Sequence, residues 1–372
     1  MFKNKIMKYN LINLAFLIVP IFCFGQKSTI TFLDELSKKP IIGLQIFSEN
    51  GSFIGNTNSL GEFELNIQLL QQGNINKILA YNTDYFSLEY NLKEVPLIIF
   101  LNKNEVVQLK EVAVTTKKTK EKYVLKGFFR SWQLVNGKLV KYGDGIVNYH
   151  VPYAETENDF NTGIKSYFTA YRTFKVDSIK QKSRIVSIST FDEYLSVSRI
   201  PKNDVLKRGK KYYSVKQVKD NLSDIYEDQK KVGYVIYDKN SEPIEINTSK
   251  SFEGDEAIKI LFWKITGSYK EIERWTGEGN TRHPSYLFNS KKSVVKNKTE
   301  GIYNNVETIT EIFIENEIIN NENKPENYKT ILDKDRSFYK SNYWDNQLMK
   351  HPLPSEIKSQ LINVNENKNS YR

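Results

Sequence analysis

Histidine is the first residue type to examine for chemistry, because imidazole titrates near neutral pH and serves as a general base or a metal ligand. Of the three histidines in the chain, His283 has the most reactive surroundings. It lies in a glycine-bearing loop, residues 274–286, that reads RWTGEGNTRHPSY. We predict that this loop contacts a ligand through side chains that stack or form hydrogen bonds, namely Trp275, Arg282, His283 and Tyr286.

Catalysis at this loop would need a nucleophile within hydrogen-bond reach of the imidazole. No Gly-x-Ser-x-Gly elbow places a serine there, and the sequence has no His-Glu-x-x-His, no His-x-x-x-His and no Asp-x-Asp-x-Asp loop. Acidic groups such as Asp192-Glu193 and Glu253 with Asp255 and Glu256 are the carboxylates a glycosidase would use, but neighbouring acids in a chain with 44 of them are usually solvated. We therefore predict no catalytic residue, no metal site and no cofactor.

The N-terminus has the pattern of a removable signal peptide. Lys3, Lys5 and Lys8 precede an apolar run of roughly 14 residues, which is shorter than the roughly 20 that a membrane-spanning helix needs. A small residue, Gly25, precedes the change in polarity, so we predict a signal peptide over residues 1–25. The chain is then exported, to the periplasm or to the outer membrane, and nucleic acid is not expected as a partner.

The single cysteine, Cys23, falls inside this leader. The mature chain would have no thiol, which excludes disulfides, cysteine nucleophiles and thiolate metal sites. The formal net charge of +10 suits contact with anionic lipids or polysaccharides, although the cations are spread along the chain as on an ordinary solvated surface.

Residues 27–115 alternate short apolar strands with polar turns, a pattern that predicts a seven-stranded β-sandwich. In one of these strands Phe63 and Leu65 alternate with Glu62 and Glu64, as expected for a sheet with one wet face. The expected strands are 28–33, 42–46, 62–67, 75–81, 85–90, 96–101 and 108–115.

Four sequence segments in this region carry a resemblance to a known family. They are PIIGLQI at 40–46, Gly51, TNSLGEFEL at 57–65 and LKEVAV at 109–114. In this order they resemble the carboxypeptidase regulatory-like domain, a transthyretin-like β-sandwich found in exported Bacteroidetes proteins. The resemblance implies an accessory fold without catalytic residues. In the sequence, Gly61 indicates a turn that needs a residue without Cβ.

A lysine- and threonine-rich stretch, residues 116–122, is typical of a linker. The following region, 123–361, predicts a larger, mostly antiparallel β domain. Its clearest signal is Asn136-Gly137 between apolar strands, a strong hairpin turn. Further strands are expected at 146–151, 165–174, 184–190, 212–218, 232–237 and 306–314, the last of them covered on both faces.

Two helices are expected in this larger region. One covers 258–272, where apolar residues recur every three or four positions, and one covers 354–361, before a disordered tail at 362–372. The domain also shows a faint similarity to periplasmic lipoprotein-carrier half-barrels, which hold acyl chains in an apolar groove. We therefore predict a mainly β fold that includes an open half-barrel as one option.

These observations favour a non-enzymatic cell-envelope protein. The sandwich would be an accessory module, and the larger domain would bind an envelope protein, a glycan or a lipid while staying peripheral to the membrane. Two alternatives stay open, a hydrolase acting on envelope glycans or peptides and a lipid-binding half-barrel carrier. A TonB-dependent receptor is excluded by length, since its 22-stranded barrel needs more than the remaining 250 or so residues.

Overall fold

The structure is a computed structural model that describes residues 28–67, 73–104, 122–152, 165–175, 205–208, 211–260, 263–277, 282–297, 303–318, 327–330 and 350–361, with the single residues Leu70, Leu195, Val197, Ser198, Leu332 and Gln347. The described residues form two compact units, one of 28–49 and 54–104, the other of 50–53 and 122–361. The expected signal peptide, the C-terminal tail and the strands at 108–115 and 184–190 lie outside the described residues, as does the expected linker except for Lys122.

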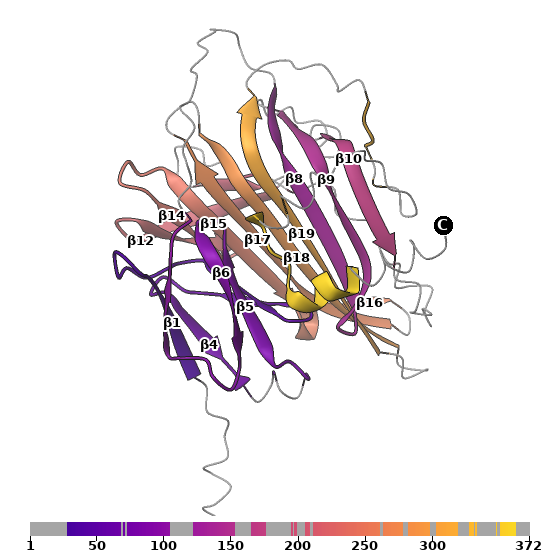
Figure 1. Ribbon diagram of the computed structural model, residues 1–372. Helices are drawn as coiled ribbons and strands as arrows, with labels where there is room; N and C mark the ends of the chain where they lie inside the picture. The colour runs from indigo at the N-terminus through magenta and orange to yellow at the C-terminus, as the bar shows by residue number, and fades with distance from the viewer. Residues whose placement is uncertain are drawn as a thin grey trace, which may run out of the picture. The chain divides into compact units, whose positions relative to one another are not determined.

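The first unit is the predicted β-sandwich (Figure 1). One sheet has the order β4-β1-β7 and the other has the order β3-β2-β5-β6. The strands are β1 (Ser28–Asp34), β2 (Gln45–Ser48), β3 (Phe53–Asn56), β4 (Glu62–Leu65), β5 (Lys77–Asn82), β6 (Tyr85–Asn91) and β7 (Ile98–Leu101).

Alternating side chains of both sheets build the core of the sandwich. Phe63 and Leu65 of β4 are buried while Glu64 between them is exposed, as the sequence predicted. Gly61 adopts φ +72°, and a Cβ there would lie 2.7 Å from the carbonyl oxygen of Phe32, so the turn before β4 requires glycine.

The second unit is one large antiparallel sheet of 12 strands, so the chain is mainly β as predicted. The order is β10-β9-β8-β19-β18-β17-β15-β14-β13-β12-β11, and β16 pairs with β17 beside this path. The strands are β8 (Lys122–Val135), β9 (Lys138–Pro152), β10 (Lys165–Lys175), β11 (Val205–Arg208), β12 (Lys211–Lys219), β13 (Leu222–Glu227), β14 (Lys230–Tyr237), β15 (Pro243–Phe252), β16 (Ile258–Ile260), β17 (Trp263–Thr276), β18 (His283–Asn297) and β19 (Tyr303–Ile318).

Turn chemistry sets the first hairpin of this sheet. Asn136 and Gly137 both have positive φ, 51° and 76°, which matches the right-handed twist of the strands they join. The predicted strand at 146–151 is the second half of β9, which runs without interruption from Lys138 to Pro152. The sequence prediction of a hairpin at Asn136-Gly137 is confirmed.

Both faces of the large sheet are covered around β19. One face, which we call the Phe129 face, carries an apolar core that includes Phe129, Tyr149 and Ile312. On the opposite face, the Arg130 face, lie Arg130, Glu311 and Tyr286, all of them buried. Residues 306–313 of β19 are buried without exception, which confirms the prediction that this strand is covered on both sides.

The helix expected at 258–272 is wrong. Ile258 lies in β16, whereas Tyr269 and Ile272 lie in β17 and point to opposite faces of the sheet. Two effects produced the misleading spacing. The apolar residues are divided between two paired strands, β16 and β17, and residues 271–274 of β17 are buried on both faces, so this part of the strand has no need to alternate. The second predicted helix is confirmed over residues 355–361.

No helix within the described residues combines the length and the apolar character that crossing a membrane requires.

Candidate functional site

Polar side chains line one row across the Phe129 face. The strand register brings together one residue from each of seven neighbouring strands, because residues directly opposite one another point to the same face. The row consists of Thr173, Gly143, Ser131, Thr310, Asn289, Glu271 and Thr248. All six side chains are buried, so this row is a polar layer inside an otherwise apolar face.

Hydroxyl groups in the middle of the row satisfy one another. The Ser131 hydroxyl lies 2.8 Å from the carbonyl oxygen of Ile309, to which it donates, and 2.9 Å from the Thr310 hydroxyl. In the next row the amide nitrogen of Gln133 donates to the Thr308 hydroxyl at 3.0 Å. These contacts hold neutral hydrogen-bonding groups at fixed positions on β8 and β19.

Two amide oxygens in this region have no hydrogen-bond partner among the described residues. They are Oε1 of Gln133 and Oδ1 of Asn289, and the two side chains are 2% and 3% exposed. A buried polar atom without a partner costs roughly 1–3 kcal/mol of stability, so native proteins keep few of them. We call Gln133, Asn289, Ser131, Thr308 and Thr310 the amide–hydroxyl site.

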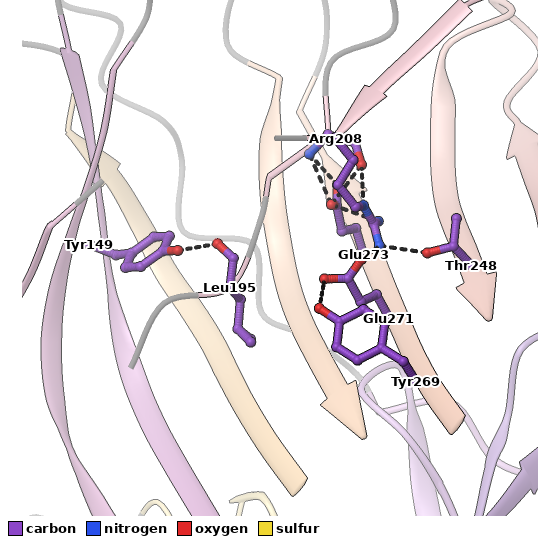
Figure 2. Close-up of polar contacts among 8 residues, drawn as sticks. Tyr149, Leu195, Arg208, Thr248, Tyr269, Glu271 and Glu273 are labelled. Carbon is purple, nitrogen blue, oxygen red and sulfur yellow. Dashed lines mark hydrogen bonds and ion pairs between the residues drawn. The ribbon is translucent and has the colours of Figure 1, made fainter. Parts of the chain in front are cut away.

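A charged cluster ends the polar row (Figure 2). Arg208 of β11 forms ion pairs with Glu271 and with Glu273 of β17, the latter at 2.9 Å. Its guanidinium group also donates to the Thr248 hydroxyl at 2.7 Å and to the Ser198 hydroxyl at 2.9 Å. Each of the three guanidinium nitrogens of this arginine therefore donates to at least one acceptor.

The cluster also reveals the curvature of the sheet. Five strand-to-strand steps separate β11 from β17, which is roughly 24 Å in a flat sheet at about 4.8 Å a step. An arginine side chain cannot span that distance. The strands β11–β15 must therefore curl over the Phe129 face, and they enclose their own apolar core of Leu206, Val215, Ile225, Val232, Val235 and Ile246.

Burial and charge act in opposite directions on the ionisable groups of the cluster. Burial raises the pKa of Glu273, against the attraction of Arg208 and the hydrogen bonds from Ser198. Burial alone would lower the pKa of Arg208, but the two carboxylates outweigh it and raise the value. The arginine therefore stays charged, and its charge is neutralised within the cluster.

The chain segment containing Leu195, Val197 and Ser198 ties the two halves of this face together. The Tyr149 hydroxyl of β9 donates to the carbonyl oxygen of Leu195 (Figure 2). The Ser198 amide donates to Glu273 at 2.9 Å. Leu195 and Val197 pack in the core of Phe129 and Tyr149. The segment thus connects the apolar core to the charged cluster.

The four residues predicted to contact a ligand do not converge. Trp275 packs against both cores of the Phe129 face, and its indole nitrogen has no hydrogen-bond partner among the described residues. Tyr286 is fully buried on the Arg130 face and donates to Glu311. Arg282 donates to Glu242 at 2.8 Å near the start of β18, and His283 pairs with Thr276 at the end of β17.

The other two histidines are packed in the protein interior. His150 meets the Tyr167 ring edge-on, with 4.8 Å between ring centroids. His351 stacks on Phe313 at 3.8 Å, and burial lowers its pKa to about 2, so its imidazole is neutral at pH 7. Among the described residues no group of His, Cys, Asp and Glu side chains is arranged to hold a metal ion.

The described acids considered for a glycosidase do not form an enclosed pair. Glu253, Asp255 and Glu256 are exposed in the turn between β15 and β16, and Asp192-Glu193 lies outside the described residues. A glycosidase needs two carboxyls that face each other across an enclosed sugar, and this exposed turn does not provide that geometry.

A second polar network lies on the Arg130 face, and it consists of arginines paired with carboxylates. Arg130 bonds Glu311 at 2.5 Å, Arg172 bonds Asp144 at 2.8 Å, and Arg274 bonds Glu245 at 3.2 Å. Arg130 also donates to the carbonyl oxygen of His351, which fixes the C-terminal segment on this face. Because each cation has a carboxylate partner, this network holds the sheet and its cover together.

Sequence reasoning missed the amide–hydroxyl site. Ser131, Gln133 and Asn289 stand in segments with no motif, and only the strand register places them side by side. The one available signal was the run of threonines in Val306-Glu307-Thr308-Ile309-Thr310, which puts two hydroxyls on the same face of a strand.

Comparison with known proteins gives no match: no protein-family model fits the chain, and no curated protein is similar to it in sequence.

Proposed function

We propose that the chain is an exported, non-enzymatic cell-envelope protein in which the large sheet binds a ligand or partner and the sandwich is an accessory module. The leader pattern of residues 1–25 and the resemblance of residues 40–114 to the carboxypeptidase regulatory-like domain support the location. The amide–hydroxyl site supports the binding role.

The main support for a binding role is that the side-chain oxygens of Gln133 and Asn289 accept no hydrogen bond from a described residue. Both amides are buried beside the hydroxyls of Thr308 and Thr310, and neither site residue carries a charge. Such groups match a neutral ligand or partner that presents hydroxyl or amide hydrogens, because each new hydrogen bond would satisfy an acceptor that now has none. A neutral glycan fragment has this chemistry.

Catalysis is not needed to explain this arrangement. Three ionisable residues are paired directly with residues of the site: Glu271 with Asn289, Lys141 with Gln133 and Lys291 with Thr308. Glu271 is bonded to Arg208, the hydroxyls of Ser131 and Thr310 bond to each other, and the Ser131 hydroxyl also donates to a backbone carbonyl. A nucleophile requires an adjacent base that takes its proton. The arrangement therefore favours holding a molecule over transforming it.

The test is calorimetric titration of the purified protein with neutral oligosaccharides and peptidoglycan fragments. We expect at least one of these to bind, and we expect Asn289→Leu to weaken that binding at least tenfold. The same variant should match or exceed the wild type in thermal stability, since the substitution removes an unpaired buried oxygen at similar volume. Gln217→Leu, which changes an exposed amide on β12, is the matched control.

Two results would count against the proposal. If no oligosaccharide or peptidoglycan fragment binds, or if Asn289→Leu binds as the wild type does, the amide–hydroxyl site is not the binding site. Turnover of a glycan that is lost in His283→Ala would favour the hydrolase instead. Recovery of the protein from the cytoplasm with Met1 retained would contradict export.

A further inference from the structure

Burial falls along one row of residues that passes through the amide–hydroxyl site. The row crosses neighbouring strands of the Phe129 face, from Lys141 through Gln133, Thr308 and Lys291 to Tyr269. The first three of these residues are 4%, 2% and 5% exposed. Lys291 is exposed and Tyr269 is partly exposed. The row therefore opens to solvent at β17 and β18, and a ligand would reach the amide–hydroxyl site from the side of Lys291.

Lys291 carries its positive charge at this open end. It forms no ion pair with an acid among the described residues. Glu271, the acid of the neighbouring row, is bonded to Arg208. Lys250, the next cation across the sheet, is bonded to Glu227 at 3.1 Å. At the open end of the described row, the Lys291 ammonium group is thus the cation that remains for a ligand.

Aromatic residues lie next to Lys291. Tyr269 stands directly opposite it, and the Tyr269 hydroxyl donates to Glu271 (Figure 2). In the next row the Phe252 ring lies close to Gly267, where a Cβ would be only 2.5 Å from the ring atom Cζ. Both aromatic residues are partly exposed. Such rings beside hydrogen-bonding groups offer a flat apolar surface on which the C–H face of a sugar can pack.

We propose that the ligand of the amide–hydroxyl site is an acidic oligosaccharide, which carries a carboxylate on one of its sugar units. Sugar hydroxyls would donate to the amide oxygens of Gln133 and Asn289, and Lys291 would bind the carboxylate. Two strand-to-strand steps separate Gln133 from Lys291, roughly 10 Å at about 4.8 Å a step, so one oligosaccharide can contact both. This inference rests on the proposed binding function and adds a charge at one end of the ligand.

The amide oxygens and the ammonium group together select this class of ligand. A fatty acid has a carboxylate for Lys291 but no hydroxyl or amide hydrogen for the amide oxygens, which would stay unpaired. A neutral oligosaccharide would satisfy the amide oxygens and leave the ammonium group without an anion. A phosphomonoester would bring about two negative charges to a single cation, whereas a carboxylate brings one.

The experiment is calorimetric titration of the full protein, purified as cells process it, with matched pairs of oligosaccharides. Oligogalacturonate and oligoglucuronate are each compared with their methyl esters, which keep the ring hydroxyls and lose the charge. We expect at least one acid to bind about three- to fivefold more tightly than its ester, which is the range of an exposed ion pair. The difference should shrink as salt is raised, because salt screens exposed charges.

Variants assign this difference to Lys291. Lys291→Gln should abolish the difference between acid and ester, and Lys291→Arg should retain most of it because the charge is kept. Asn289→Leu should weaken the binding of both forms at least tenfold. Lys296→Gln is the matched control, since it removes an exposed lysine of the same strand that lies on the opposite face, and it should bind the acid as the wild type does. Circular dichroism and thermal melting establish that each variant is folded.

Two kinds of outcome would overturn the proposal, and they can be told apart. If neutral oligosaccharides bind through Asn289 but no acid binds more tightly than its ester, the ligand is not acidic and the proposed binding function stands. The same conclusion follows if the folded Lys291→Gln variant keeps the full difference. If neither the acids, the esters nor any neutral oligosaccharide binds, the proposed binding function fails together with this inference.

Discussion

At the scale of single residues, the two faces of the large sheet use charge in the same way. Arg208 on the Phe129 face and Arg130 on the Arg130 face are each buried and each bonded to glutamate on a neighbouring or overlying strand. Arginine suits these positions because its planar guanidinium group offers five donors and stays charged when buried. The neutral amides of Gln133 and Asn289 differ in kind, since their oxygens are buried without such a partner.

Removal of Arg208 should be severely destabilising. In Arg208→Met, Glu271 and Glu273 would stay buried without a cation, and breaking a buried pair on one side costs about 3–5 kcal/mol. Adding Glu271→Gln and Glu273→Gln to the same variant should recover most of this loss, because both uncompensated charges are gone. Urea denaturation of the three proteins measures the effect. If the single and the triple variant lose the same free energy of unfolding, the ion pairs do not hold β11 in place.

At the scale of the elements, the strands predicted correctly are those with a clear local pattern, either a turn dipeptide or an alternation of apolar and polar residues. Asn136-Gly137 marks the β8–β9 hairpin, and the Phe63 alternation marks β4, because turn chemistry and a wet face are both local properties. The same reasoning failed for β17 and left β15 and β18 unpredicted. Part of each strand, residues 245–248, 271–274 and 286–290, is buried on both faces, so charged and apolar positions there follow contacts made by distant strands.

The candidate site could not be predicted from the sequence because it also depends on contacts between distant strands. The predicted loop residues Trp275 and Tyr286 belong to strands whose register sends them to opposite faces. Convergence of side chains in a sheet depends on pairing between strands far apart in sequence, such as β8 with β19. A sequence pattern reports residue types within one strand, and it contains no information on which strand lies beside it.

Close backbone approach within the sheet leads to a prediction for Gly127 of β8. A Cβ at this position would lie 2.0 Å from the carbonyl oxygen of Phe313, so Gly127→Ala must push β8 away from β19 and break ladder hydrogen bonds. We expect a loss of more than about 3 kcal/mol, or failure to fold. Gly254→Asn is the control, because its Cβ would meet nothing within 4 Å and asparagine tolerates the positive φ there. Thermal melting distinguishes the two, and a Gly127→Ala protein that melts with the wild type would contradict the register.

At the scale of the whole molecule, the two units have separate apolar cores. Twelve buried residues of the sandwich, among them Phe32, Leu44 and Ile78, form one core, and the partly buried side chains packed against it belong to the same unit. The large sheet has its own cores on the Phe129 face. Each unit therefore holds the buried surface that a domain of its size needs to fold.

This separation predicts that a fragment of residues 26–104 folds alone. It contains all seven strands of the sandwich and the complete core around Phe32, so unfolding should be cooperative and reversible. A well-dispersed amide NMR spectrum and a single denaturation transition are the expected results. A fragment that is unfolded at neutral pH would show that the sandwich depends on the rest of the chain.

The break between β15 and β16 has a consequence for how this sheet tolerates changes in length. Both strands pair with β17, with Phe252 opposite Gly267 and Ile258 opposite Ile265, and the residues between them form an exposed turn. Each strand is aligned on β17 by its own hydrogen bonds, so extra residues inserted between Glu253 and Ala257 would enlarge the turn without displacing either alignment. The turn is therefore a suitable place to graft a tag or an epitope, and such a graft would leave the pairing of both strands with β17 unchanged.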